Sequence, residues 1–227
     1  MPSLHFSSWL FLAFMAIGLP YGAVTTARRT PSAEGPAHIA SRSQLHLNAM
    51  ATHLLIFGIA WYAGLLQGLR FLEPVHLTAR DLLAGAVALA LMGGMAWLSQ
   101  RMRSEEERRR MWVLGFLPRT LREGVPFTLL AAVGAVSEEL AYRGVTFTLC
   151  TMLTGSAIAG AVIAALLFAA AHFPQGVKSM AIIFGIALVK QELVVFTGTL
   201  WVAIGVHFTY NVLTAVRMAR QAREFTA

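Results

Sequence analysis

Long apolar stretches separated by short polar segments make up most of the chain. About 20 apolar residues in a helix match the thickness of the bilayer core, and seven stretches are of roughly this length. They cover residues 7–26, 47–67, 81–99, 124–153, 155–173, 176–197 and 199–217. The pattern therefore predicts an all-α fold, a polytopic membrane bundle of about seven transmembrane helices.

The composition agrees with a membrane protein. Of the 227 residues, 57% are hydrophobic and 13% are charged, which excludes an ordinary soluble domain. The net charge of +7 does not indicate nucleic-acid binding, because the arginines gather at the ends of the apolar stretches. We expect the first stretch to be a retained span rather than a signal peptide, since no basic segment precedes it and Arg28 and Arg29 follow it.

Lys and Arg residues outside the stretches predict an orientation. Fourteen of them lie in segments that follow the first, third, fifth and seventh stretches, whereas only Arg70 and Arg80 lie on the opposite side. The positive-inside rule then places the carboxyl terminus in the cytoplasm. We expect an integral protein of a bacterial cytoplasmic membrane. Its predicted regions are an amino-terminal region with a basic loop (1–123), a helical core (124–217) and a basic cytoplasmic tail (218–227).

Three charged residues interrupt the fourth stretch. An ionised side chain at bilayer depth costs about 2.5–3.5 kcal/mol, so Glu138, Glu139 and Arg143 need a compensating role. Glu139 and Arg143 are four residues apart and can pair on one helix face. Glu138 is rotated by about 100° from Glu139 and stays available for chemistry. The alternative is an ion pair that only fixes helix packing.

Later stretches carry further polar side chains. His172 follows Phe168 by one helical turn, and Asn211 follows His207 in the same way. Such side chains face the interior of a bundle, where a carboxylate or imidazole can take a proton from water and an amide can stabilise an oxyanion. Hydrogen bonding between helices is the structural alternative. Lys190 and Glu192 also interrupt the sixth stretch, and either contact the same cavity or mark a kink.

These residues form an ordered set of motifs. It consists of Glu138-Glu139-x-x-x-Arg143, Phe168-x-x-x-His172 and His207-x-x-x-Asn211. On successive apolar stretches, this set resembles the CAAX protease and bacteriocin-processing family of intramembrane glutamate proteases, which includes the type II CAAX prenyl endopeptidases. The resemblance covers roughly residues 124–215, so the predicted core would be catalytic.

The resemblance implies an intramembrane endopeptidase. In it, Glu138 and His172 would activate the attacking water, and His207 and Asn211 would stabilise the oxyanion. The residues that would orient the site or pack beside it are Glu139, Arg143 and Phe168. The expected partners are a membrane-associated protein or peptide substrate and the lipid bilayer, with no nucleic acid.

The cofactor and the function class have alternatives. The family has also been described as zinc metalloproteases, but the chain has no His-Glu-x-x-His motif and its candidate ligands are spread over three helices. We therefore expect no cofactor, with zinc as the alternative. A proton-coupled transporter would predict inverted repeats, and none is visible. A non-catalytic immunity or scaffold protein is the other alternative, and the complete motif set argues against it.

Overall fold

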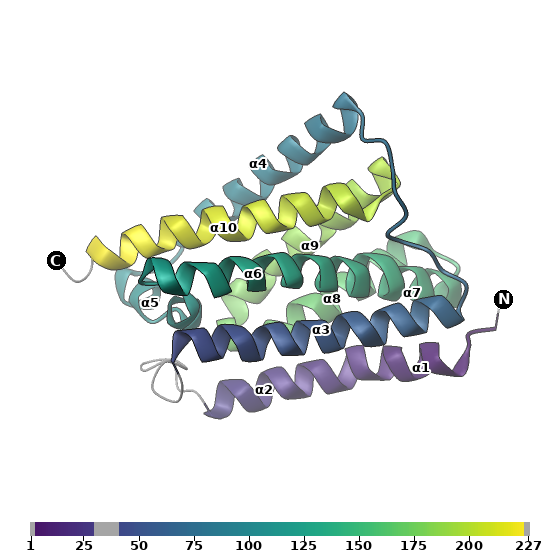
Figure 1. Ribbon diagram of the computed structural model, residues 1–227, viewed down its shortest axis with the longest axis horizontal. Coiled ribbons are helices and arrows are strands. Elements are labelled where there is room, and N and C mark those ends of the chain that lie inside the picture. Colours follow the sequence, from purple (N-terminus) through teal and green to yellow (C-terminus); the bar gives the residue numbers. More distant parts are fainter. Residues whose placement is uncertain (1–2, 30–40, 225–227) are drawn as a thin grey trace.

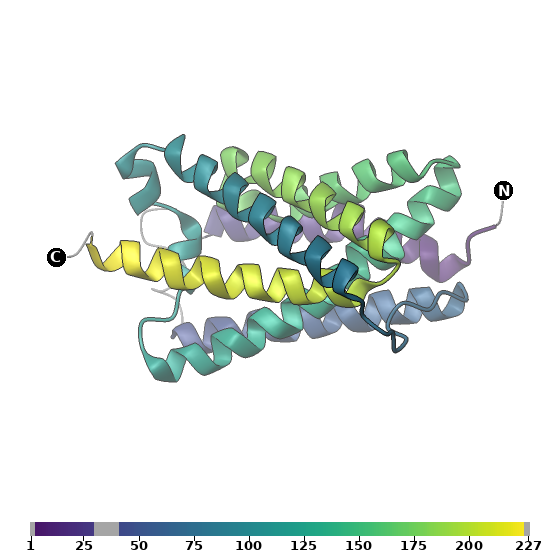
Figure 2. The same cartoon turned by 90° about the horizontal axis from the view of Figure 1, so that it is seen from above.

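The computed structural model describes residues 3–29 and 41–224, which are helical throughout apart from short connections and contain no strand. The long helices form a bundle and run mostly along its long axis (Figures 1 and 2). The elements before the predicted core are α1 (Phe6–Ala13), η1 (Phe14–Gly18), α2 (Leu19–Arg29), α3 (Arg42–Leu66), α4 (Ala79–Arg101), α5 (Glu105–Arg109) and η3 (Trp112–Phe116). Those that follow are α6 (Leu121–Glu138), η4 (Glu139–Thr146), α7 (Phe147–Thr154), α8 (Ala157–Ala171), η5 (Phe173–Gln175), α9 (Val177–Thr197) and α10 (Leu200–Glu224).

Each of the seven predicted stretches is helical. Within the described residues, five helices are long and apolar enough to cross a membrane, namely Phe6–Arg28, Arg42–Leu66, Ala79–Arg101, Leu121–Thr154 and Val177–Thr197. The all-α polytopic membrane fold is thus confirmed, but the count of seven spans is not. The two remaining stretches are α8, which has 15 residues, and α10, which carries several polar side chains along its length.

Turn residues set the ends of the helices around the predicted core. Gly155 and Gly198 end α7 and α9 with positive φ angles of 68° and 67°, a conformation that suits glycine. The side chains of Ser104 and Thr120 cap α5 and α6 by accepting hydrogen bonds from backbone N–H groups. The last helices therefore follow one another through short turns, as the sequence predicts.

The segment η4 lies at the centre of the bundle. All eight of its residues are buried, and its apolar side chains Leu140 and Val145 belong to the main hydrophobic core. The charged residues of the fourth stretch are therefore inside the protein rather than facing lipid. Helices α3, α7, α8 and α10 all pack around this segment.

The connections rich in arginine lie at one end of the bundle. Helix α5 and the end of α10 are close to this end (Figure 1). The Lys178 ammonium at the start of α9 lies 2.6 Å from a carboxylate oxygen of Glu107, and Arg103 donates a hydrogen bond to Ser179. The predicted tail 218–227 begins within α10, which continues to Glu224, and residues 225–227 lie outside the described residues.

Candidate active site

A buried ion cluster surrounds Glu139, the first residue of η4. The Glu139 carboxylate is fully buried and accepts a hydrogen bond from Lys190 Nζ, at 2.6 Å from Oε1. Its other oxygen lies 3.4 Å from Arg143 Nε, and Oε1 also lies 2.7 Å from His207 Nδ1. The predicted pairing of Glu139 with Arg143 is present. It is part of a larger cluster in which two cations face one carboxylate.

Phe168 on α8 packs against both cations of this cluster. The Arg143 guanidinium carbon lies 4.2 Å from the centre of the Phe168 ring, and Lys190 Nζ lies 4.9 Å from it. A ring face attracts a cation, and the attraction is stronger where water is excluded. Phe168 thus stabilises the buried cations and lies beside the predicted site.

Glu138 is turned away from the ion cluster and toward a cavity of about 680 Å³. Its side chain keeps 15% of its surface exposed, whereas that of Glu139 has none. Each carboxylate oxygen of Glu138 has an imidazole near it. Oε2 lies 3.6 Å from His207 Nε2, and Oε1 lies 3.9 Å from His53 Nε2. Of the two adjacent carboxylates, one is neutralised by cations and the other faces open space.

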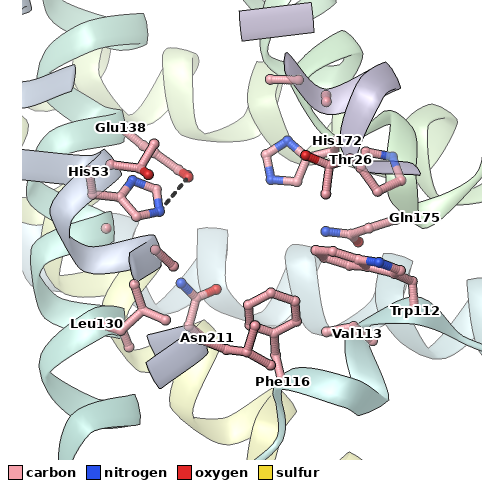
Figure 3. A pocket seen from close by; sticks show the side chains of 18 of the residues that line it. Thr26, His53, Trp112, Val113, Phe116, Leu130, Glu138, His172, Gln175 and Asn211 are labelled. Carbon is pink, nitrogen blue, oxygen red and sulfur yellow. Dashed lines mark ion pairs between the residues drawn. The ribbon is translucent and has the colours of Figure 1, made fainter. Parts of the chain in front are cut away.

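His172 lies across this cavity from Glu138 and His53 (Figure 3). Its Nδ1 donates a hydrogen bond of 2.8 Å to the Phe168 carbonyl oxygen, because a carbonyl oxygen can only accept. The neutral ring therefore carries its lone pair on Nε2. This nitrogen is the one that can take up a proton.

Asn211 borders both the large cavity and a smaller one of about 200 Å³. His172 borders both cavities as well, whereas His207 and Lys190 line the smaller one. The predicted site residues Glu138, His172, His207 and Asn211 thus come together around two neighbouring hollows. A carboxylate, imidazole nitrogens and an amide donor around two neighbouring cavities are the groups that amide hydrolysis requires.

Two further residues join the site. His53 on α3 lies beside Glu138, and its Nδ1 is buried without a hydrogen-bond partner. The motif comparison missed it, although a histidine within an apolar stretch is itself a signal. Lys190, which the sequence left open between a cavity contact and a kink, belongs to the ion cluster. Its neighbour Glu192 is exposed on α9.

The expectation that the site works without a metal stays a prediction. In residues 3–29 and 41–224, no three His, Cys, Asp or Glu side chains are arranged so that they could hold a metal ion.

The fold and the site define a membrane-embedded helical protein with a buried polar centre beside a cavity. Residues 121–213 match the family described as type II CAAX prenyl endopeptidase Rce1-like. This region, from α6 to the middle of α10, is thus similar to the type II CAAX prenyl endopeptidases, and it contains all seven predicted site residues. The helices before α6, with His53, lie outside the match. The chain has no significant match among curated proteins or solved structures.

Proposed function

We propose that the chain is an intramembrane endopeptidase that cleaves a membrane-associated protein or peptide with water activated by Glu138. The family match supports the peptidase class. The observation that carries the proposal is the different surroundings of the two adjacent carboxylates. Glu139 is buried between Lys190 and Arg143, while Glu138 borders a cavity of about 680 Å³ that a peptide segment can enter.

The proposed reaction begins when Glu138, or the imidazole of His172 on the other side of the cavity, takes a proton from water. The water oxygen then bonds to the scissile carbonyl carbon, and the carbonyl oxygen becomes an oxyanion. The Asn211 amide, which borders both cavities, donates a hydrogen bond to it. The stored proton passes to the amide nitrogen as the C–N bond breaks. A preorganised donor in a low-dielectric bundle stabilises this charge more than water would.

We place the cleavage on the cytoplasmic side of a bacterial cytoplasmic membrane. The large cavity is lined by Trp112 and Gln175, which lie in connections at the arginine-rich end of the bundle (Figure 3). The positive-inside rule assigns such an end to the cytoplasm. A substrate would therefore reach Glu138 from that side, and its carboxyl or amino terminus would be released there.

Comparing membrane proteomes tests this proposal. Cells that carry Glu138→Gln should accumulate at least one membrane-associated protein in uncut form, because the amide cannot accept the water proton. Glu192→Gln is the matched control, since it alters another carboxylate of an apolar helix but one that is exposed on α9. Identical cleavage patterns in the Glu138→Gln and wild-type cells, with both proteins present at equal levels, would contradict the proposal and favour a proton relay or a scaffold.

A further inference from the structure

Three polar atoms from three elements form a small buried triangle. Lys190 Nζ lies 2.6 Å from Glu139 Oε1 and 3.0 Å from His207 Nδ1, and the latter two atoms are 2.7 Å apart. All three side chains are buried. With water excluded, these three groups have to form their hydrogen bonds with one another, so the positions of the protons can be deduced.

The contact between Glu139 and His207 requires a proton. An ionised carboxylate only accepts hydrogen bonds, and an imidazole nitrogen without hydrogen is also an acceptor. Two acceptors 2.7 Å apart in a dry interior would repel each other and remain unsatisfied. Nδ1 of His207 therefore carries a hydrogen and donates to Glu139. Oε1 accepts a second hydrogen bond from Lys190, because a carboxylate oxygen has two lone pairs. Lys190 Nζ and His207 Nδ1 are then two donors directed at the same oxygen, so their own contact of 3.0 Å is not a hydrogen bond.

The charge on Lys190 decides whether His207 carries a second proton. The charged and titratable groups around the ring come from three elements: Glu138 from α6, Glu139 and Arg143 from η4, and Lys190 from α9. Glu139 is already balanced by two cations. Glu138, 3.6 Å from Nε2, favours a cationic ring, but it borders the cavity and its field is weakened by solvent. Lys190 is closer, at 3.0 Å, and fully enclosed, so its repulsion is stronger.

We propose that Lys190 is a positioning residue of the site. Together with Glu139, it fixes His207 as a neutral imidazole that is protonated on Nδ1 and turns the lone pair of Nε2 toward Glu138 and the smaller cavity. His207 then cannot donate to an oxyanion, which is the role that the family resemblance implies for it. Oxyanion stabilisation is left to Asn211.

This assignment gives His207 another part in the reaction and, in that respect, rests on the proposed function. Nε2 of His207 and Oε2 of Glu138 are two acceptors 3.6 Å apart, at the border between the two neighbouring cavities, so a water beside both can donate to either. When its oxygen bonds to the carbonyl carbon, one of the two acceptors takes the proton. The same proton is later delivered to the leaving amide nitrogen as the C–N bond breaks.

Nitrogen NMR of the full chain in bilayer discs tests the proposal without a substrate. The protein is labelled with ¹⁵N in its histidine rings, and the His207 signals are those that disappear in His207→Gln. At neutral pH, Nδ1 should show the shift of a protonated nitrogen and Nε2 that of a bare one. At about pH 6, close to where a free histidine titrates, the His207 ring of Lys190→Met should be doubly protonated, while that of the wild type stays neutral.

Lys178→Met is the matched control, because it removes another lysine from α9 that pairs with exposed Glu107 instead. Its His207 signals should equal those of the wild type. A hydrogen on Nε2 of the wild-type ring would overturn the proposal, even if Lys190→Met does not fold. Equal protonation in folded Lys190→Met and wild type would also overturn it. An unchanged proteome with Glu138→Gln, by contrast, would contradict only the peptidase function and leave the proton assignment intact.

Discussion

Substituting Lys190 and Glu139 gives a quantitative test of how much burial strengthens an ion pair in this protein. The perturbations are Lys190→Met and Glu139→Gln, made singly and together. The chain also offers an internal comparison, because Lys178 and Glu107 have the same nitrogen–oxygen distance of 2.6 Å. The side chains of the first pair are 1% and 0% exposed, and those of the second are 58% and 42% exposed. Burial is thus the main difference between the two pairs.

The contacts of each residue indicate how much its substitution should destabilise the protein. Breaking a buried pair by removing one partner costs about 3–5 kcal/mol, because an unpaired charge remains. Glu139→Gln leaves both Lys190 and Arg143 without an anion, so we expect the upper end of this range. Lys190→Met leaves Glu139 with Arg143 and should cost less. The double variant removes both charges, so the sum of the single effects should exceed its effect by about 1–3 kcal/mol.

The assay is reversible unfolding in mixed micelles with increasing dodecyl sulfate, followed by circular dichroism. The control cycle of Lys178→Met and Glu107→Gln should show no measurable coupling, because water screens an exposed pair. Additive effects in the buried cycle would refute the reasoning. So would the same coupling in both cycles, since distance alone would then determine the energy.

Three other perturbations test the site and its packing. His53→Gln should slow cleavage about tenfold, because the imidazole beside Glu138 is lost. Thr52→Val in the same cavity wall should leave the rate of cleavage unchanged. Equal rates for both variants would contradict a role for His53. Gly160→Ala should destabilise the protein by about 1–3 kcal/mol in the same unfolding assay. The reason is that the new Cβ would lie 3.0 Å from the Phe147 carbonyl oxygen and the Thr151 backbone nitrogen. Unchanged stability would argue against this close approach of α7 and α8. Treating the purified protein with a chelator should leave cleavage unchanged, and a loss of activity that zinc restores would contradict the metal-free mechanism.

The sequence predicts which residues of the candidate site lie together, because its motifs are local. Glu139 and Arg143, or His207 and Asn211, share a helix face wherever the helix lies, and a lipid environment turns polar faces inward. Their convergence then follows from packing three apolar helices together. Apolar length also identifies the helices, although only five of the seven predicted stretches are long and apolar enough to span a membrane in the described residues.

Other features depend on contacts between helices that are distant in sequence. Lys190 pairs with a carboxylate 51 residues away, and the spacing within α9 holds no information about that partner. His53 reaches Glu138 only because α3 packs against α6. Apolar length alone also does not determine the number of spans, for a physical reason. Helix α8 is shorter than a bilayer requires, and α10 carries the polar side chains of the site.

The most direct test of the account is cleavage by the purified protein in bilayer discs. The substrate would be the membrane-associated protein that accumulates in Glu138→Gln cells, and mass spectrometry would identify the new termini. We predict that the wild type cuts one peptide bond and that Glu138→Gln, folded and with the same thermal stability, cuts at least about a hundredfold more slowly. Cleavage at the wild-type rate by Glu138→Gln would contradict the central claim that this carboxylate activates the attacking water.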